Sequence, residues 1–216
     1  MLVTIPGRLV TVAPLDPARH GDSLWAAWSG DENDGLWTYL FDGPYESREA
    51  FQSALEKKAS TNDPLFFAIV ENASGDAVGY ASFMRIEPVH RVIEVGSILF
   101  TPRLQRTAGA TEAMYLMARH AFEELGYRRY EWKCDSRNEP SRRAALRLGF
   151  TFEGVFRQHM IVKGRNRDTA WYSMLDSEWP ARRAAFERWL DAGNFDESGR
   201  QRCKLESCDR GFRPGL

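Results

Sequence analysis

Long hydrophobic runs and paired cysteines are both missing from this sequence of 216 residues. No apolar stretch approaches the roughly 20 residues that a membrane-spanning helix needs, so no membrane partner is expected. The first residues lack the basic-then-apolar order of a signal peptide, which favours a cytoplasmic protein. The three cysteines indicate no disulfide framework, and Cys203 and Cys208 lie in a polar segment without a nearby histidine. We therefore expect no metal site.

An excess of charge of either sign is missing as well. Lys and Arg total 29 and Asp and Glu total 30, which leaves a formal net charge of −1. This balance gives no general attraction to nucleic acid, and no nucleic-acid partner is expected. The arginines within 142–147 and 182–188 are accordingly interpreted as parts of solvated helix faces.

The length is typical of one domain, and an apolar content of 43% is enough for a core. We expect a single domain over residues 1–192. Residues 193–216 are polar and have little to bury, so they are expected to form a flexible tail.

Hydrophobic periodicity divides the chain into strands and helices. Apolar runs of strand length predict strands at 8–15, 65–70, 77–86, 92–100, 128–134, 151–162 and 168–175. Helical spacing predicts helices at 16–28, 47–59, 110–125, 138–148 and 179–190. Turns join the strands from 65 to 100, which should therefore be antiparallel. A helix separates 92–100 from 128–134, and this crossover makes those two strands parallel. The pattern predicts an α/β fold with a mixed sheet.

The turn after the strand 92–100 is rich in small residues and reads Gln105-Arg106-Thr107-Ala108-Gly109-Ala110-Thr111. Small residues let the backbone approach a ligand, and the free amides of a helix N-terminus favour a phosphate. The same residues could instead serve only tight packing of the helix on the sheet, and both interpretations stay open. The dinucleotide fingerprint G-x-G-x-x-G and the Gly-Lys-Ser/Thr of P-loops are absent.

Residues 94–150 as a whole resemble the GNAT superfamily of acetyl-CoA-dependent N-acetyltransferases. Within it, they are most similar to the branch of the ribosomal-protein N-terminal acetyltransferases. The segments that carry the resemblance are Glu94 to Leu99, Gln105 to Met114, Asn138 to Arg143 and Leu148-Gly149-Phe150. The similarity covers about Arg8 to Leu190. It implies that residues 1–192 are an acyl-CoA N-acyltransferase domain. The sheet would have about seven strands, mostly antiparallel, with helices on both faces and a V-shaped splay between the fourth and fifth strands.

The resemblance also implies where acetyl-CoA, the co-substrate, would bind. The pantetheine arm would pair with the backbone of Ile98, Leu99 and Phe100 like an added strand and would contact Asn138. The pyrophosphate would lie on the turn formed by Gln105, Arg106, Thr107, Ala108, Gly109, Ala110 and Thr111. In the family this turn has the form Gln/Arg-x-x-Gly-x-Gly/Ala. Here Ala108 replaces the central glycine and Gly109 is displaced by one position.

Two catalytic residues follow from the same resemblance. Ser141 would be the general acid for the departing thiolate, and its alternative role is to satisfy a backbone amide in the first turn of its helix. Glu94 would be the general base, acting through water, because an ammonium group is not nucleophilic. Its alternative is a strand-end carboxylate in solvent. Glu153 and His90 are weaker candidates for the base. Backbone amides near Leu99 would stabilise the oxyanion.

Four aromatic residues of the loop 29–45 lie where the family builds its acceptor site, namely Trp37, Tyr39, Phe41 and Tyr45. They would bind the acceptor, or alternatively they pack the helices onto the sheet. Cys134 alternates with the core-facing Trp132 and is expected to be a buried, inert thiol.

These expectations combine into one hypothesis and one alternative. The protein would transfer acetyl from acetyl-CoA to a primary amine of a small molecule or of a peptide N-terminus, by direct attack in a ternary complex. The alternative is a non-catalytic acyl-CoA- or peptide-binding module on the same fold. Both a monomer and a homodimer are compatible with the sequence.

Overall fold

The computed structural model describes residues 3–206, in which one eight-stranded sheet runs in the order β1-β2-β3-β4-β5-β6-β8-β7. Cys208 lies outside the described residues. The strands are β1 (Ile5–Pro6), β2 (Val10–Pro14), β3 (Leu65–Glu71), β4 (Ala77–Glu87), β5 (Val92–Phe100), β6 (Arg129–Asp135), β7 (Thr151–Val162) and β8 (Arg165–Leu175). Neighbouring strands are antiparallel except β5 and β6, which are parallel.

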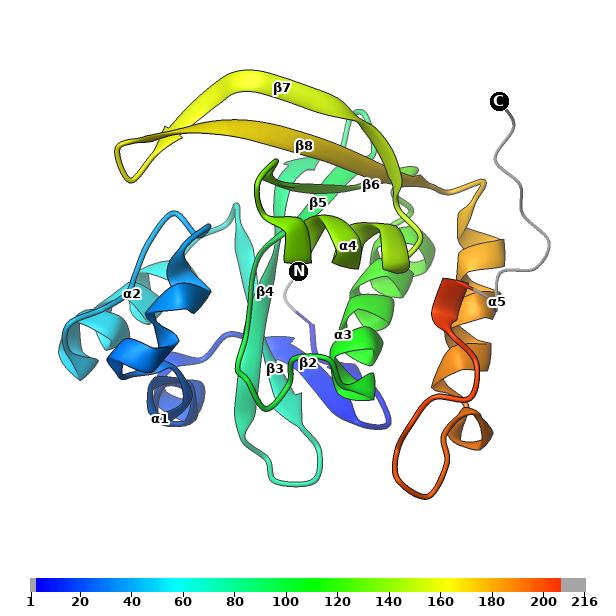
Figure 1. Ribbon diagram of the computed structural model, residues 1–216, viewed down its shortest axis with the longest axis horizontal. Coiled ribbons are helices and arrows are strands. Elements are labelled where there is room, and N and C mark those ends of the chain that lie inside the picture. Colours follow the sequence, from blue (N-terminus) through cyan, green and yellow to red (C-terminus); the bar gives the residue numbers. More distant parts are fainter. Residues whose placement is uncertain (1–2, 207–216) are drawn as a thin grey trace.

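Helices lie on both faces of this sheet (Figure 1). They are α1 (Pro17–Trp28), η1 (Asp31–Trp37), α2 (Arg48–Ala59), α3 (Ala108–Arg119), η2 (His120–Glu124), α4 (Glu139–Arg147), α5 (Trp179–Leu190) and η3 (Ala192–Asn194). The predicted α/β class, mixed sheet and parallel pair are confirmed. The sheet has one strand more than expected because Ile5 and Pro6 pair with β2, and two residues are too few to show a periodicity.

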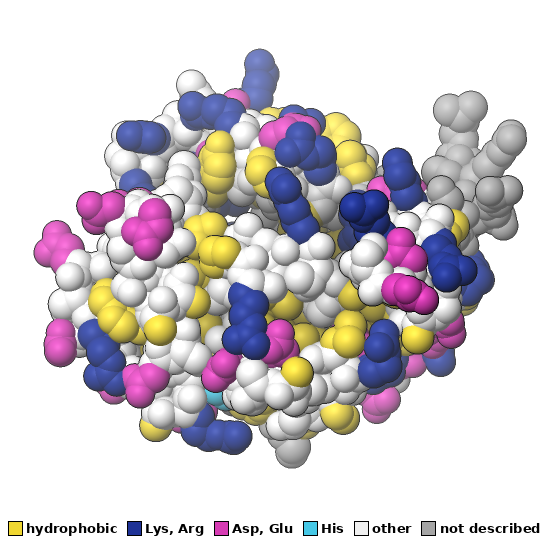
Figure 2. All heavy atoms as spheres, turned by 60° about the horizontal axis from the view of Figure 1, so that its bottom comes forward, with side chains coloured by type: hydrophobic (Ala, Val, Ile, Leu, Met, Phe, Trp, Pro, Cys, Tyr) yellow, Lys and Arg dark blue, Asp and Glu magenta, His cyan; other side chains and the backbone are white. Residues whose placement is uncertain are grey.

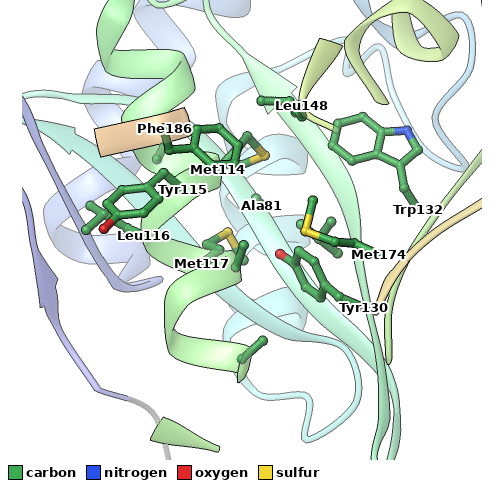
Figure 3. Close-up of a cluster of buried hydrophobic side chains, with 14 of the residues drawn as sticks. Ala81, Met114, Tyr115, Leu116, Met117, Tyr130, Trp132, Leu148, Met174 and Phe186 are labelled. Carbon is green, nitrogen blue, oxygen red and sulfur yellow. The ribbon is translucent and has the colours of Figure 1, made fainter. Parts of the chain in front are cut away.

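Two hydrophobic cores hold the helices to the sheet. On one face, Leu24 and Trp28 of α1 and Phe51 and Leu55 of α2 pack against Tyr80 of β4. On the other face, α3 and α5 pack in a larger core. Figure 3 shows Met114 and Met117 of α3 on the same cluster as Tyr130 of β6 and Met174 of β8. The small side chains at 113 and 118 of α3 and at 121 of η2 let these helices approach the sheet closely.

The N-terminal strands are attached to α3 through one carboxylate. Glu112 is 5% exposed, and its two oxygens accept the backbone N–H groups of Arg8 (3.1 Å), Leu9 (2.6 Å) and Val10 (2.9 Å). A buried carboxylate is stable only when its lone pairs are satisfied, and three N–H donors achieve this. Glu112 therefore fixes the turn between β1 and β2 against the start of α3.

Residues 193–206, part of the segment expected to be a flexible tail, make contacts with α5. Phe195 forms an isolated bridge with Gln201, and the Gln201 side chain accepts a hydrogen bond from Trp189 of α5 at 2.8 Å. The Phe195 ring lies 5.2 Å from that of Trp189, and Leu205 is 4% exposed. The sequence pattern missed this packing because only two apolar side chains, spaced ten positions apart, reach α5.

No helix of the described residues is long and apolar enough to cross a membrane. Nor do His, Cys, Asp and Glu side chains form a group of three or more that could hold a metal within residues 3–206. Figure 2 shows positive and negative side chains interspersed over the face that it presents, in keeping with the balanced net charge.

The hydroxyl of Tyr130 is buried and has no hydrogen-bond partner among the described residues. An unpaired buried polar group costs about 1–3 kcal/mol. Tyr130→Phe should therefore raise the free energy of unfolding by about 1 kcal/mol, as measured by chemical denaturation.

Tyr115→Phe is the matched control for this prediction, because the Tyr115 hydroxyl donates to Glu187 Oε1 at 3.0 Å. This variant should lose about 1 kcal/mol instead. A lower stability of Tyr130→Phe would show that its hydroxyl is satisfied in solution.

Candidate active site

The parallel strands β5 and β6 are paired over only part of their length. Their pairing ends with Val95 opposite Trp132. Beyond this pair, β5 continues to Phe100 and β6 to Asp135 without pairing to each other. The predicted V-shaped opening between these strands is thus confirmed. Buried backbone N–H and C=O groups need partners, so the inner edges of the two strands can pair with an extended ligand.

A β-bulge in β5 lies where the opening begins. The register with β4 shifts between Gly96 and Leu99, and Ser97 within the bulge has a left-handed φ of 48°. An extra residue bends the strand and reverses the faces that later side chains take. Val95 accordingly packs in the core on the α3 side, whereas Leu99 packs in the core on the α1 side.

The three residues expected along the pantetheine arm follow this bulge. Leu99 and Phe100 pair with β4 on one edge of the strand only. Ile98 and Phe100 are partly buried against the α3-side core, and Leu99 is buried on the opposite face. Their side chains are therefore engaged in packing, and it is the backbone of β5 that borders the opening.

The first turn of α4 lies beside the end of the strand pairing. The Asn138 side-chain oxygen accepts the backbone N–H of Ser141 at 3.1 Å, and its amide Nδ2 has no partner among the described residues. The Ser141 hydroxyl oxygen accepts a hydrogen bond from Trp132 Nε1 at 3.0 Å. A hydroxyl that accepts one hydrogen bond still has its own hydrogen to donate. Trp132 ends the pairing with β5, so it places Ser141 at the apex of the opening.

The turn before α3 is held by its own side chains. Gln105 Nε2 donates to the carbonyl of Phe100 at 2.9 Å. The Thr107 hydroxyl donates to the Leu104 carbonyl at 2.7 Å and accepts the backbone N–H of Ala110 at 3.2 Å, so it caps α3. The next amides, at positions 108 and 109, have no acceptor among the described residues. Unpaired amides at a helix N-terminus suit a pyrophosphate.

The packing interpretation of the small residues applies to part of this turn. Ala108 begins the helix, and the left-handed residue of the turn is Arg106, with a φ of 62°. Gly109 serves close packing, since a Cβ there would lie 3.1 Å from Val10. Thr111 is buried, and its hydroxyl accepts a hydrogen bond from an arginine of α4 at 3.0 Å, so its side chain faces the protein interior.

Glu94 is buried and paired with two cations. It is 3% exposed, which excludes the alternative of a solvated strand-end carboxylate. Its Oε2 lies 2.6 Å from Arg85 Nη1 and 2.9 Å from Lys133 Nζ. Its Oε1 accepts no hydrogen bond from the described residues. Because Glu94 directly precedes Val95, this free oxygen lies close to the point where β5 and β6 separate.

The Glu94 pair extends into a charge ladder across the sheet. Lys133 Nζ also contacts Glu131 at 2.6 Å, and Glu131 contacts Arg129 Nε at 2.6 Å. Arg129 in turn contacts Glu153 of β7 at 2.5 Å. We use the name charge ladder for Arg85, Glu94, Lys133, Glu131, Arg129 and Glu153. Each charge has a partner of opposite sign, which offsets part of the cost of burial.

The two weaker candidates for the general base lie elsewhere. Glu153 is bonded to Arg129, whose guanidinium holds the pKa of this carboxyl below its ordinary value. Its hydrogen bond with Ser173 acts in the same direction. His90 lies exposed in the turn before β5, at the end of the strand opposite to the opening. Glu94 is therefore the candidate base that lies nearest to the opening.

The four aromatic residues of the expected acceptor loop divide into two pairs. Trp37 is 2% exposed, and its ring lies 5.3 Å from that of Tyr45. Tyr45 donates to Asp42 at 2.5 Å, and Asp42 pairs with Lys58. Burial alone would raise the pKa of Asp42, but the Lys58 ammonium holds it below its ordinary value. Trp37 and Tyr45 thus pack the loop onto the helices, as in the alternative interpretation.

The other two aromatic residues remain candidates for acceptor binding. Phe41 is 49% exposed, and the Tyr39 hydroxyl donates to the carbonyl of Arg137, just before α4, at 3.1 Å. The loop is also clamped by Lys163, in the turn between β7 and β8. Its ammonium donates to three loop carbonyls, at positions 37, 42 and 43, over 2.7–2.9 Å. Figure 1 shows this hairpin extending over the α2 side of the molecule.

Lys133 and Lys163 are functional candidates that the sequence alone did not predict. Lys133 alternates with Glu131 and Arg129 along β6, and this row of alternating charge was the available signal. Lys163 was assigned only to a turn, and no local pattern links it to a loop about 120 positions away.

Cys134 is a buried free thiol, as predicted. Burial raises the pKa of the Cys134 thiol above its ordinary value. The reactive thiolate is therefore disfavoured, and an acyl-enzyme at Cys134 is not indicated.

Known proteins resemble this chain in both sequence and structure. Residues 10–151 match the acetyltransferase (GNAT) domain model. A GCN5-related N-acetyltransferase from Brucella melitensis, known from its crystal structure, is 49% identical with a TM-score of 0.95, covering 97% of this chain and 95% of that chain. The uncharacterized N-acetyltransferase YoaA of Bacillus subtilis is 32% identical over 160 residues, covering 73% of this chain and 88% of that protein. The ribosomal-protein-serine acetyltransferase of Escherichia coli is 30% identical over 143 residues, covering 66% of this chain and 78% of that protein.

The matched domain spans the opening, the capped turn of α3 and the first turn of α4. These elements carry the motifs that the sequence resemblance rested on. The chain therefore belongs to the GNAT family and is an acetyl-CoA-dependent N-acetyltransferase.

Proposed function

We propose that the protein transfers acetyl from acetyl-CoA to a primary amine of a small molecule or a peptide N-terminus, by direct attack in a ternary complex. The observation that carries the proposal is the opening between β5 and β6, with Ser141 on one side and the free oxygen of Glu94 on the other. A thioester in this opening would lie between a proton donor and a proton acceptor.

Three features support binding of acetyl-CoA in this opening. The inner edge of β5 beyond Val95 offers backbone groups to the amides of the pantetheine arm. The Asn138 amide is free to donate to the same arm. The unpaired amides at the start of α3 offer a cradle for the pyrophosphate.

Ser141 is proposed as the general acid. The indole of Trp132 occupies one lone pair of its oxygen and fixes its position, while the hydroxyl hydrogen is available to the departing thiolate. Backbone N–H groups near Leu99 would stabilise the negative charge that develops on the thioester oxygen.

Glu94 is proposed as the general base, through one water. Arg85 and Lys133 both bind Oε2, which fixes the carboxylate and leaves Oε1 to accept a proton from that water. The amine would become neutral in this way before it attacks the thioester carbon. Since Cys134 is a buried protonated thiol, attack by the amine itself is the simplest route.

The relatives differ in the acceptors that their names record, which are ribosomal-protein serine for the E. coli enzyme and spermidine for an enzyme of Vibrio cholerae. We propose that this chain belongs to the branch of the ribosomal-protein N-terminal acetyltransferases, which the motif resemblance and the E. coli relative support.

Ser141→Ala and Glu94→Gln should each lower kcat by about 100-fold or more, because each removes a proton-transfer group. Binding of CoA, measured by calorimetry, should be retained in both variants. The measurement is thiol release from acetyl-CoA across a panel of amines.

Glu131→Gln is the matched control, since Glu131 shares Lys133 with Glu94 but has both oxygens paired, Oε1 with Arg129 and Oε2 with Lys133. Its kcat should stay within about threefold of the wild type. If the wild type binds CoA but releases no thiol with any amine, the chain is a binding module.

Lys163→Met should raise the KM for the amine by about tenfold, because the loop loses three charge-assisted hydrogen bonds. The affinity for CoA should not change. Arg165→Met, in the same hairpin and exposed, is the control. An equal KM in both variants would show that the clamp does not shape the acceptor site.

A further inference from the structure

One buried arginine near the opening lacks a counter-ion. Arg167 of β8 exposes 8% of its surface. Its Nε donates to the Thr169 hydroxyl at 3.2 Å, and its guanidinium lies 5.1 Å from the centre of the Phe41 ring. No carboxylate oxygen of the described residues lies within 4.0 Å of it, whereas every cation of the charge ladder has such a partner.

A buried charge of this kind is unfavourable by itself. An arginine carries five N–H donors, and here only Nε–H has a hydrogen-bond acceptor among the described residues. Burial lowers the pKa of the Arg167 guanidinium, against the attraction of the more distant Asp135. Arginine nevertheless stays cationic in proteins, so the site contains a positive charge that no carboxylate of the described residues contacts directly.

Arg167 lies beside the opening and beside the expected acceptor loop. Its neighbour Thr169 pairs with Asp135, the last residue of β6, so Arg167 lies just past the end of that strand, where β5 and β6 are separated. Phe41, which contacts the guanidinium, belongs to the expected acceptor loop. The proposed pyrophosphate cradle follows Phe100 of β5, across the opening from β6 and β8.

We propose that Arg167 binds a carboxylate of the acceptor, so that the preferred substrates are amines that also carry a carboxylate, such as free amino acids. The planar guanidinium fork matches a carboxylate with two parallel hydrogen bonds. The Phe41 ring supports the guanidinium and offers an apolar surface to the rest of the acceptor. A polyamine would instead bring a second positive charge towards Arg167, which disfavours it.

This inference rests on the proposed amine acetylation, and the first experiment measures both. Thiol release is compared for pairs of acceptors that differ only at the carboxylate, namely leucine, β-alanine and γ-aminobutyrate against their carboxamides. In the wild type, kcat/KM for at least one carboxylate should exceed that of its carboxamide by about 30-fold or more. Arg167→Met should bring this ratio close to one, and Arg167→Lys should give an intermediate value.

Arg165→Met is the control, since this exposed arginine lies on the same strand and should keep the wild-type ratio. Thermal unfolding of each variant verifies that the ratios are compared between folded proteins. A wild-type ratio near one, or an unchanged ratio in Arg167→Met, would overturn the inference.

A second experiment does not depend on turnover. The N-acetylated products of the same amino acids and their carboxamides are titrated into the CoA-bound protein by calorimetry. Binding of a carboxylate about 30-fold tighter than its carboxamide, lost in Arg167→Met, supports the inference even if no amine is acetylated. Equal binding of the two forms overturns it. Absence of thiol release with retained carboxylate binding would therefore refute the proposed function alone.

Discussion

The interruption of the one parallel strand pair found within residues 3–206 is the constraint on which the site depends. Hydrogen bonding between β5 and β6 stops after Val95 and Trp132, although both strands continue. Backbone groups left without partners at the inner edges are unfavourable unless a ligand supplies their bonds. The bulge at Ser97 bends β5 at this point, and the Trp132 indole holds Ser141 beside it. The fold thus creates a gap of fixed position and surrounds it with chemically suitable groups.

The charge ladder lies at the end of this gap where β5 and β6 are still paired. Ion pairs that are removed from water contribute little net stability, because the desolvation cost offsets their attraction. Their contribution here is geometric. Lys133 binds the carboxylates of both Glu94 and Glu131, which lie opposite each other in the parallel register, and so joins the two strands just before they separate. The orientation of the Glu94 carboxylate follows from the same contact.

Much of this architecture could be predicted from periodicity, since α3 and the strands of the meander have strong apolar patterns. The environments of individual side chains were harder to predict from the sequence. Trp37 and Phe41 are similar as aromatic loop residues, yet the first is buried and the second half exposed, because only tertiary packing distinguishes them. The Ser97 bulge likewise reverses the faces of β5 for Leu99, which simple alternation assigns wrongly. Arg167 belongs to no sequence motif. Only the folded structure shows that no carboxylate of the described residues contacts its guanidinium.

The anchoring carboxylate of Glu112 has a consequence for the order in which the chain is made. Its contacts join positions that are 102–104 residues apart in sequence. During ribosomal synthesis at roughly 5–20 residues per second, the turn between β1 and β2 is made about 5–20 s before Glu112 of α3, whose carboxylate accepts the backbone N–H groups of that turn. Throughout that interval the amino-terminal segment has no native anchor on the α3 side. Arrival of α3 therefore anchors the first strands of the sheet and, at the same time, completes the turn that precedes this helix.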